Sequence, residues 1–178
     1  MKKTVIAAVA SLALAGAAFA GSYEPMKDFK KEMIPPPPPT CFSDTEFQLD
    51  FFGTYNWTID PNEYHDNAGG GVAANYIFAR YFGIGADTNL FSGGANGVWQ
   101  SSGYLILRYP IDDYCLAPYA IAGGGYQYDG HGEGTWHAGG GLEYRVVPHS
   151  VGLFTEGRYT WAEDNDTAQV RAGLRVVF

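Results

Sequence analysis

Lysine is missing from most of this chain. All five lysines lie at or before residue 31, and the basic residues of the long remainder are arginines. Acidic residues outnumber basic ones by 19 to 11, which gives a formal net charge of −8. This excess of acid disfavours nucleic acid or an anionic lipid surface as a partner, because both repel a negatively charged protein.

Apolar runs long enough for an ordinary transmembrane helix are also missing. The nearest approach is residues 1–20, MKKTVIAAVASLALAGAAFA, which pass from Lys2 and Lys3 through a short Ala-rich stretch to Ala-Phe-Ala. This order is typical of a secretory signal peptide, and it predicts cleavage before Gly21. A retained anchor is the alternative, but the apolar stretch is short for one.

Residues 21–40 hold the other three lysines and end in five consecutive prolines followed by Thr40. Such a proline run adopts an extended polyproline conformation. We therefore expect a periplasmic leader that acts as a tether rather than as a domain. Cleavage before this leader leaves 9 basic and 19 acidic residues, a formal charge of −10 on the mature chain.

From Cys41 onward, apolar and polar residues alternate with a period of two, which is the pattern of β-strands. Eight segments follow this pattern: 45–57, 68–78, 82–91, 99–109, 117–128, 135–147, 151–162 and 167–178. Each has about the length that a tilted strand needs to cross a bilayer, roughly 9 to 11 residues. Residues 41–178 are therefore expected to form one all-β domain.

The connections between these segments alternate in character. Polar or Gly-rich loops occupy 58–67, 92–98, 129–134 and 163–166, whereas the turns near Arg80 and His149 are tight and the IDDYCLA connection is longer. An even number of strands with short turns on one side and looser loops on the other predicts an eight-stranded antiparallel up-and-down transmembrane barrel. A soluble periplasmic barrel is the alternative, but it would crowd large aromatic side chains into one narrow interior.

Charged residues share one face of the predicted strands. In segment 167–178, Leu174 and Val176 lie on one side and Arg171 and Arg175 on the other. A charge that faces lipid at mid-membrane costs on the order of 2 to 4 kcal/mol, so the charged face is expected to point inward. The inward set comprises five acids and five arginines: Glu46, Asp50, Asp87, Glu143, Glu156, Arg108, Arg145, Arg158, Arg171 and Arg175.

This balanced set predicts a salt-bridged interior. Arginine suits close pairing because its guanidinium group binds a carboxylate through two parallel hydrogen bonds. The interior of an eight-stranded barrel is just wide enough for side chains to fill, so we expect it to be largely closed, with a narrow pore for ions or small solutes as the alternative. Four inward glycines are expected to make room for the guanidinium groups: Gly83, Gly85, Gly139 and Gly141.

Segment 117–128 does not show which face points inward. Tyr119 and Ile121 lie opposite Ala120 and Ala122, so both faces are small or apolar. Its three consecutive glycines, 123–125, are a candidate β-bulge.

The looser loops carry acids and no lysine or arginine. Eight residues form this acidic rim: Asp60, Glu63, Asp66, Asp129, Glu133, Glu163, Asp164 and Asp166. Such a rim keeps neighbouring proteins apart and soluble, which is its simplest explanation. The sharper hypothesis is that divalent cations bridge the rim to lipopolysaccharide phosphates, or that the rim binds a basic partner.

The two cysteines, Cys41 and Cys115, both fall at the predicted periplasmic end. Because an exported protein enters an oxidising compartment, we expect a disulfide between them. Strands 1 and 5 lie opposite each other in an eight-stranded barrel, so this bond would tie the leader across the mouth.

Three stretches carry a resemblance to a known family: the hairpin GGGVAANYIFARYFGIGAD, EGRYTW, and the closing VRAGLRVVF. With the eight strands, they make residues 41–178 resemble the small outer-membrane β-barrels typified by the transmembrane domain of outer membrane protein A and by outer membrane protein X. The resemblance implies a Gram-negative-type outer membrane, periplasmic termini, and contact with outer-membrane lipids and lipopolysaccharide. It also implies that the terminal Phe178 is a signal read by the barrel assembly machinery.

The family resemblance fixes fold and location better than activity. Lipid-modifying barrels of the deacylase type are similar to one another in carrying a His-x-Ser pair. In this chain His137 is followed by Ala138 and Gly139, so the serine hydroxyl is missing. Neither His131 nor its acidic neighbours show a distinctive metal-ligand spacing. We therefore expect a monomeric structural or surface-interaction protein without enzymatic activity, metal or cofactor.

Overall fold

The computed structural model describes residues 40–59, 67–92, 97–128, 132–162 and 166–178. The expected signal peptide at 1–20 lies outside the described residues, as does the leader at 21–40 except for Thr40.

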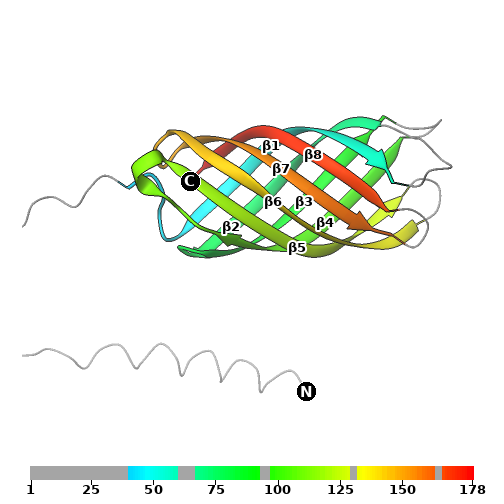
Figure 1. Ribbon diagram of the computed structural model, residues 1–178, viewed down its shortest axis with the longest axis horizontal. Coiled ribbons are helices and arrows are strands. Elements are labelled where there is room, and N and C mark those ends of the chain that lie inside the picture. The colour runs from blue at the N-terminus through cyan, green and yellow to red at the C-terminus, as the bar shows by residue number, and fades with distance from the viewer. Residues whose placement is uncertain (1–39, 60–66, 93–96, 129–131, 163–165) are drawn as a thin grey trace, which may run out of the picture. The chain divides into compact units, whose positions relative to one another are not determined.

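The described residues form a closed barrel in which each strand pairs with its neighbours in chain order and β8 pairs with β1 (Figure 1). Every pairing is antiparallel. The strands are β1 Glu46–Thr58, β2 Asn67–Ala79, β3 Phe82–Phe91, β4 Val98–Arg108, β5 Leu116–Tyr128, β6 Gly132–Val147, β7 Val151–Trp161 and β8 Thr167–Val177. The predicted up-and-down barrel is thus confirmed, with strand bounds shifted by at most three residues.

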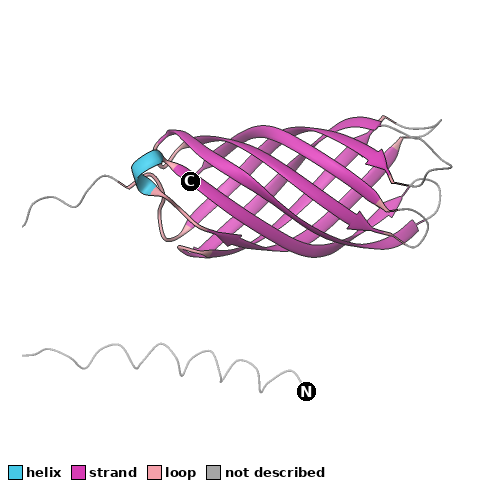
Figure 2. Cartoon of the chain, in the orientation of Figure 1, coloured by secondary structure: helices cyan, strands magenta, loops and turns pink. Residues whose placement is uncertain are grey.

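One short 3₁₀ helix, η1 (Asp112–Tyr114), interrupts the described connections, between β4 and β5 (Figure 2). Within the described ranges, no helix is long and apolar enough to cross a membrane. The helix lies at the same end of the barrel as Phe178, together with the turns between β2 and β3 and between β6 and β7 (Figure 1). We call this end the C-terminal mouth.

Side chains alternate between a polar inside and an apolar outside. In β1, Gln48 is fully buried, whereas Phe47 and Phe51 are 43% and 55% exposed. The alternative of a soluble barrel with an apolar interior is therefore wrong, because large apolar side chains cover the outer wall. This alternation fixes the pairing register between neighbouring strands, because a slip by one residue would turn every side chain to the other face.

Strand β5 points its larger side chains inward. Tyr119 and Ile121 are buried with Ile77, Tyr104 and Ile106 in one cluster. The pairing of β5 with β4 and β6 runs without a register shift, so the expected bulge at residues 123–125 is absent. Packing against apolar neighbours decides the facing of this strand, and its own alternation does not reveal it.

The inward glycines make room for rings and for neighbouring strands rather than for guanidinium groups, so that expectation is wrong. A Cβ atom on Gly85 would lie 2.4 Å from the Tyr104 ring, and one on Gly141 would lie 2.6 Å from the Tyr119 hydroxyl. Glycine at these positions lets both tyrosines lie across the interior.

We expect Gly85→Ala to lower the free energy of unfolding by about 1 to 3 kcal/mol, because the added methyl group overlaps the Tyr104 ring. The matched control is Gly157→Ala, where a Cβ atom meets nothing within 4 Å. That variant should change stability by less than about 0.5 kcal/mol. Urea titration followed by heat-modifiable gel mobility measures both, and equal effects of the two variants would contradict the packing assigned to Gly85.

Candidate functional site

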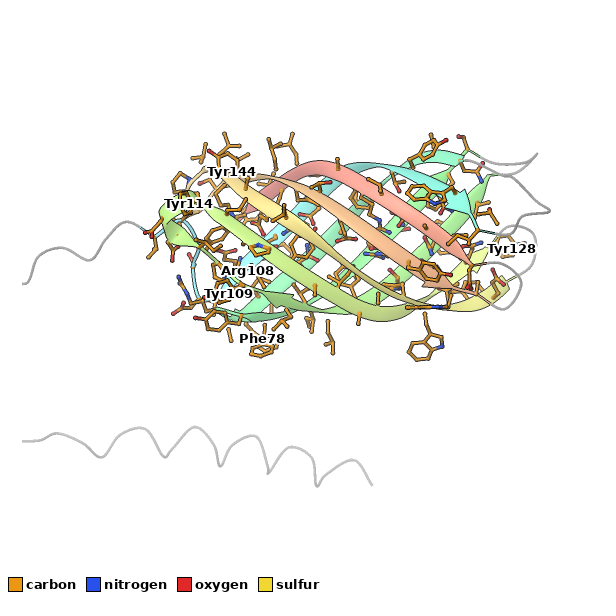
Figure 3. All side chains as sticks on the ribbon, viewed as in Figure 1. Phe78, Arg108, Tyr109, Tyr114, Tyr128 and Tyr144 are labelled. Carbon is orange, nitrogen blue, oxygen red and sulfur yellow. A yellow bond between two sulfur atoms is a disulfide. The ribbon has the colours of Figure 1, made fainter. Side chains whose placement is uncertain are left out.

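The ten charged residues singled out from the sequence are all buried inside the barrel, among them Arg108, which is labelled in Figure 3. None is more than 6% exposed. An ionised side chain removed from water to this extent is stable only with a partner of opposite charge and further hydrogen bonds. The structure supplies such partners in two clusters.

The first cluster lies toward the C-terminal mouth, and we call it the mouth cluster. It contains Glu46, Asp50, Glu143, Arg108, Arg145 and Arg175. Glu46 Oε2 accepts hydrogen bonds from Arg108 at 2.8 Å and from Arg145 at 2.6 Å. One carboxylate from β1 therefore joins β4 to β6 across the interior.

Glu143 and Asp50 extend this chain of ion pairs. Glu143 lies 2.5 Å from Arg145 Nε and 2.6 Å from Arg175 Nη1. Arg175 also donates two parallel hydrogen bonds to the Asp50 carboxylate, from Nε and from Nη2, each at 2.7 Å. The Asn75 amide donates to Asp50 at 2.8 Å. Three acids and three arginines are thus continuously paired.

The second cluster, which we call the central cluster, contains Asp87, Glu156, Arg158 and Arg171. Arg158 Nη2 lies 2.9 Å from Asp87 and 3.0 Å from Glu156. Arg171 Nη1 lies 2.6 Å from Asp87. Ser102 donates its hydroxyl proton to Asp87 at 2.7 Å. This cluster too has as many acids as bases.

Two tyrosines connect the clusters. The Tyr104 hydroxyl donates to Asn75 at 2.8 Å, and the Arg158 guanidinium lies 5.1 Å from the Tyr104 ring centre. The Tyr119 hydroxyl donates to Glu156 at 3.1 Å. Each ring therefore supplies an apolar face to an arginine or a hydroxyl to the polar network, which suits an amphipathic side chain in a mixed interior.

Two phenylalanines fill the remaining width between β1 and β7. The rings of Phe52 and Phe154 meet edge to face at 6.1 Å. Arg171 lies 4.8 Å above the first ring and Arg175 lies 4.9 Å above the second. Aromatic and charged side chains thus both lie across the interior at this level.

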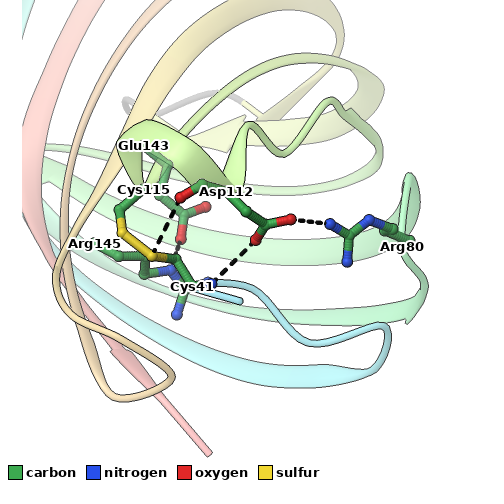
Figure 4. The surroundings of a disulfide bond; sticks show 6 residues. All are labelled: Cys41, Arg80, Asp112, Cys115, Glu143 and Arg145. Atoms are coloured by element: carbon green, nitrogen blue, oxygen red, sulfur yellow. Dashed lines mark hydrogen bonds and ion pairs between the residues drawn. A yellow bond between two sulfur atoms is a disulfide. The ribbon is translucent and has the colours of Figure 1, made fainter. Parts of the chain in front are cut away.

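The C-terminal mouth is crossed by residues 41–45, which we call the mouth segment. A disulfide joins Cys41 to Cys115, with Cα atoms 5.3 Å apart (Figure 4). The next residue, Phe42, is 1% exposed. The guanidinium groups of Arg108 and Arg145 lie 5.2 and 5.0 Å from the centre of its ring. Phe42 was not among the predicted site residues, and nothing in its local sequence distinguishes it from a lipid-facing phenylalanine.

Polar contacts at the edge of the C-terminal mouth also hold the mouth segment, and we call this edge the mouth rim to distinguish it from the acidic rim of the loops. The Cys41 amide donates to Asp112 Oδ1 at 3.0 Å, and Asp112 also pairs with Arg80 (Figure 4). Partial burial favours the neutral form of Arg80, but the Asp112 carboxylate outweighs it, so the pKa of the guanidinium group is raised above its usual value. Arg80, in the tight turn between β2 and β3, thus belongs to this rim.

His137 lies inside the barrel without a protein partner. It is 2% exposed, neither ring nitrogen has a hydrogen-bond partner, and its ring meets Tyr104 edge-on at 6.0 Å. Asp129 and His131, weighed with it as metal ligands, lie outside the described residues. Over the described part of the chain, no group of three or more His, Cys, Asp or Glu side chains is arranged to hold a metal ion.

Most of the predicted acidic rim lies outside the described residues: Asp60, Glu63, Asp66, Asp129, Glu163 and Asp164. Glu133, predicted in a loop, belongs to β6 and is half-buried, because β6 continues its pairing with β5 as far as Gly132 and Tyr128. Asp166 accepts a hydrogen bond from the Tyr159 hydroxyl at 2.8 Å.

Phe178 closes the ladder between the first and last strands. Its amide donates to the Phe47 carbonyl at 2.9 Å, and its carbonyl accepts from the Phe47 amide at 3.2 Å. The side chain is 71% exposed on the outer wall. Recognition of this residue by an assembly machinery stays a prediction.

No family model and no curated protein matches this chain. Solved structures do match: Neisserial surface protein A has a TM-score of 0.61 at 15% identity, covering 76% of this chain and 98% of that one. The N-terminal β-barrel domain of Pseudomonas aeruginosa OprF has a TM-score of 0.60 at 15% identity, covering 75% of this chain and 97% of that one.

A third structure, the attachment invasion locus protein Ail of Yersinia pestis, has a TM-score of 0.56 at 14% identity, covering 75% of this chain and 97% of that one. The fold is that of the small outer-membrane β-barrels. The predicted resemblance to these barrels is confirmed at the level of fold, and identities this low carry no information on activity.

We expect Arg175→Gln to cost about 3 to 5 kcal/mol of stability, because it leaves two buried carboxylates without their main partner. Adding Asp50→Asn to that variant should restore part of the loss, since the two residues are directly paired. The control Arg80→Gln, at the rim, should cost no more than about 1 kcal/mol. Chemical unfolding of the wild type, the single variants Arg175→Gln and Asp50→Asn, the double variant and the control measures this, and additive losses would contradict the pairing.

Proposed function

We propose that this chain is a non-enzymatic outer-membrane protein with a closed interior and a structural or surface-interaction role. The observation that carries the proposal is the inversion of the barrel, which has an apolar wall outside and paired charges inside. We further propose that it is monomeric and that both termini face the periplasm.

The outer wall supports insertion into a bilayer. Large apolar residues are exposed on all eight strands, including Leu105 at 66% and Leu90 at 67%. A soluble monomer rarely exposes a continuous apolar surface of this extent. Aromatic residues gather near both strand ends, such as the stacked pair Tyr81 and Tyr109 at 6.2 Å and the pair Tyr159 and Trp161 at 4.9 Å. Such girdles are typical of the two membrane interfaces.

The interior supports a closed barrel over a pore. The mouth and central clusters each carry no net charge, and the rings of Phe52, Phe154, Tyr104 and Tyr119 lie between them. A permeant ion would have to separate buried ion pairs, which is strongly unfavourable. A narrow pore remains the alternative function, and conductance distinguishes the two.

A structural role also accounts for the Ser–His contact at the rim. Ser43 Oγ lies 3.0 Å from His149 Nδ1, as in a nucleophile and its base. However, the His149 amide also donates to the Cys41 carbonyl at 3.3 Å. Both bonds fasten the mouth segment to the turn between β6 and β7, so we assign the pair to positioning and not to catalysis.

The acidic loop sequences favour a cationic surface partner. Ail, which shares the fold, has been solved with the heparin analogue sucrose octasulfate, with a TM-score of 0.53 to this chain. With Glu133 assigned to β6, the loop sequences of the present chain carry seven acids and no lysine or arginine. They would repel such a polyanion, so we propose contact with a basic partner or, through divalent cations, with lipopolysaccharide phosphates.

Membrane insertion is tested by Leu105→Arg, which places a charge in the middle of the outer wall. In lipid vesicles it should lower the free energy of unfolding by about 2 to 4 kcal/mol. The matched control Leu105→Ala, which removes apolar contact without adding a charge, should lose less. Equal stability of the two variants in a bilayer would show that this wall does not face lipid.

The closed interior is tested by single-channel recording in a planar bilayer with protein shown to be folded by its heat-modifiable mobility. We expect no conductance, because the ten buried charges neutralise one another. Steady conductance would show that the interior is wet and would make transport the leading function.

A further inference from the structure

We propose that the Cys41–Cys115 disulfide is a thiol-exchange site, and that its reduction by a dithiol protein releases Phe42 and opens the C-terminal mouth. The proposal goes beyond the structural role given above and depends on the fold alone, so it stands whether or not the barrel conducts.

Topology makes this disulfide a strap across the mouth. Cys41 precedes β1, whereas Cys115 directly precedes β5, four strands away around the closed barrel. The two cysteines are 74 residues apart in sequence. The mouth segment must therefore cross the opening to reach its partner, and the bond holds together two places that the strand ladder alone does not join.

The Cys41–Cys115 disulfide holds Phe42 in the C-terminal mouth. The Phe42 ring packs with Cys41 and Ala117. The two arginines that lie against the ring, Arg108 and Arg145, are each 1% exposed. They also bind Glu46. The ring therefore separates the mouth cluster from the solvent at this end.

The two sulfur atoms differ in access. Cys41 is 5% exposed, whereas Cys115 is half-buried and packs at the edge of the same cluster. Cys115 follows η1 in the left-handed region, with φ 52°, where a non-glycine residue is strained. Its neighbour Tyr114 is 73% exposed. Cys115 is thus the more exposed of the two cysteines, and we take its Sγ as the atom that an incoming thiolate attacks.

The exchange balances as follows. A thiolate of the reductant attacks Cys115 Sγ and forms a mixed disulfide, while Cys41 leaves as a thiolate and takes up a proton. The second thiol of the reductant then attacks its own sulfur in the mixed disulfide, and Cys115 leaves and is protonated. Two electrons pass to the cysteines, and the reductant, a dithiol protein of the thioredoxin-like class, is left as a disulfide.

After reduction, the contacts that remain on the mouth segment are hydrogen bonds, one exposed ion pair and the packing of the Phe42 ring. The hydrogen bonds run from Cys41 N to Asp112, from Ser43 N to Glu46 at 2.6 Å, from Arg108 Nη2 to the Ser43 carbonyl at 3.2 Å, and from His149 N to the Cys41 carbonyl. The ion pair joins Asp44 to Arg80 at 3.4 Å. Water competes for such bonds, and the segment regains its chain entropy once the strap is open. The ion pairs of the mouth cluster do not include the segment, so the barrel itself stays folded.

The test places 4-fluorophenylalanine at position 42 of the refolded full chain and follows its fluorine NMR signal with a soluble gadolinium chelate. In the oxidised protein we expect weak relaxation by the chelate, and after dithiothreitol a several-fold increase. A second probe at Phe154, in the barrel core, should stay protected in both states. Intact mass after alkylation establishes complete reduction, and heat-modifiable mobility reports the fold.

The matched control is the double variant Cys41→Ser with Cys115→Ser, which should show the reduced-like signal without any reductant. Three results would overturn the proposal. Position 42 stays protected after complete reduction, or is already exposed in the oxidised protein, or becomes exposed together with Phe154 because the whole barrel unfolds. A dithiol thioredoxin-like protein should then reduce the folded chain, and failure of that reaction would also overturn it.

Discussion

The pairing of buried arginines with buried carboxylates is the interaction on which the rest of this structure depends. A closed sheet with an apolar outer wall has no other place for its charged strand residues than the interior, where an unpaired charge is strongly unfavourable. The two clusters meet this constraint with equal numbers of acids and bases. Five of the ion pairs join strands that are not neighbours in the sheet, such as Glu46 of β1 with Arg145 of β6. The network therefore braces the barrel as well as neutralising it.

Aromatic side chains complete what the charges leave unfilled. Guanidinium groups lie against the rings of Phe42, Phe52, Tyr104 and Phe154, so one face of several arginines is covered by apolar surface while the edge binds carboxylates. Glycines next to the tyrosine rings, such as Gly85 and Gly141, leave the space that the rings of Tyr104 and Tyr119 occupy. Charge pairing and ring packing thus share one interior, and a segment that belongs to no strand crosses the C-terminal mouth.

Much of the fold could be predicted because alternation is a local property. The period of two located eight strands, and the cost of a charge in lipid assigned a face to most of them. Local patterns could not orient β5, where both faces are small or apolar, and they mistook the role of the inward glycines. Glu133 was placed in a loop because its flanking glycines look like turn residues, whereas pairing with β5 extends the strand through them.

The sequence by itself determined the barrel, the inward set of charges and the two cysteines, because strand periodicity, charge balance and residue type are all written along the chain. Tertiary structure decided which acid pairs with which arginine, that Tyr104 and Tyr119 join the two clusters, and that Phe42 fills the mouth. These contacts connect residues up to 125 positions apart, as in Arg175 with Asp50. Their distances depend on the closure and stagger of the whole sheet, which no local pattern records.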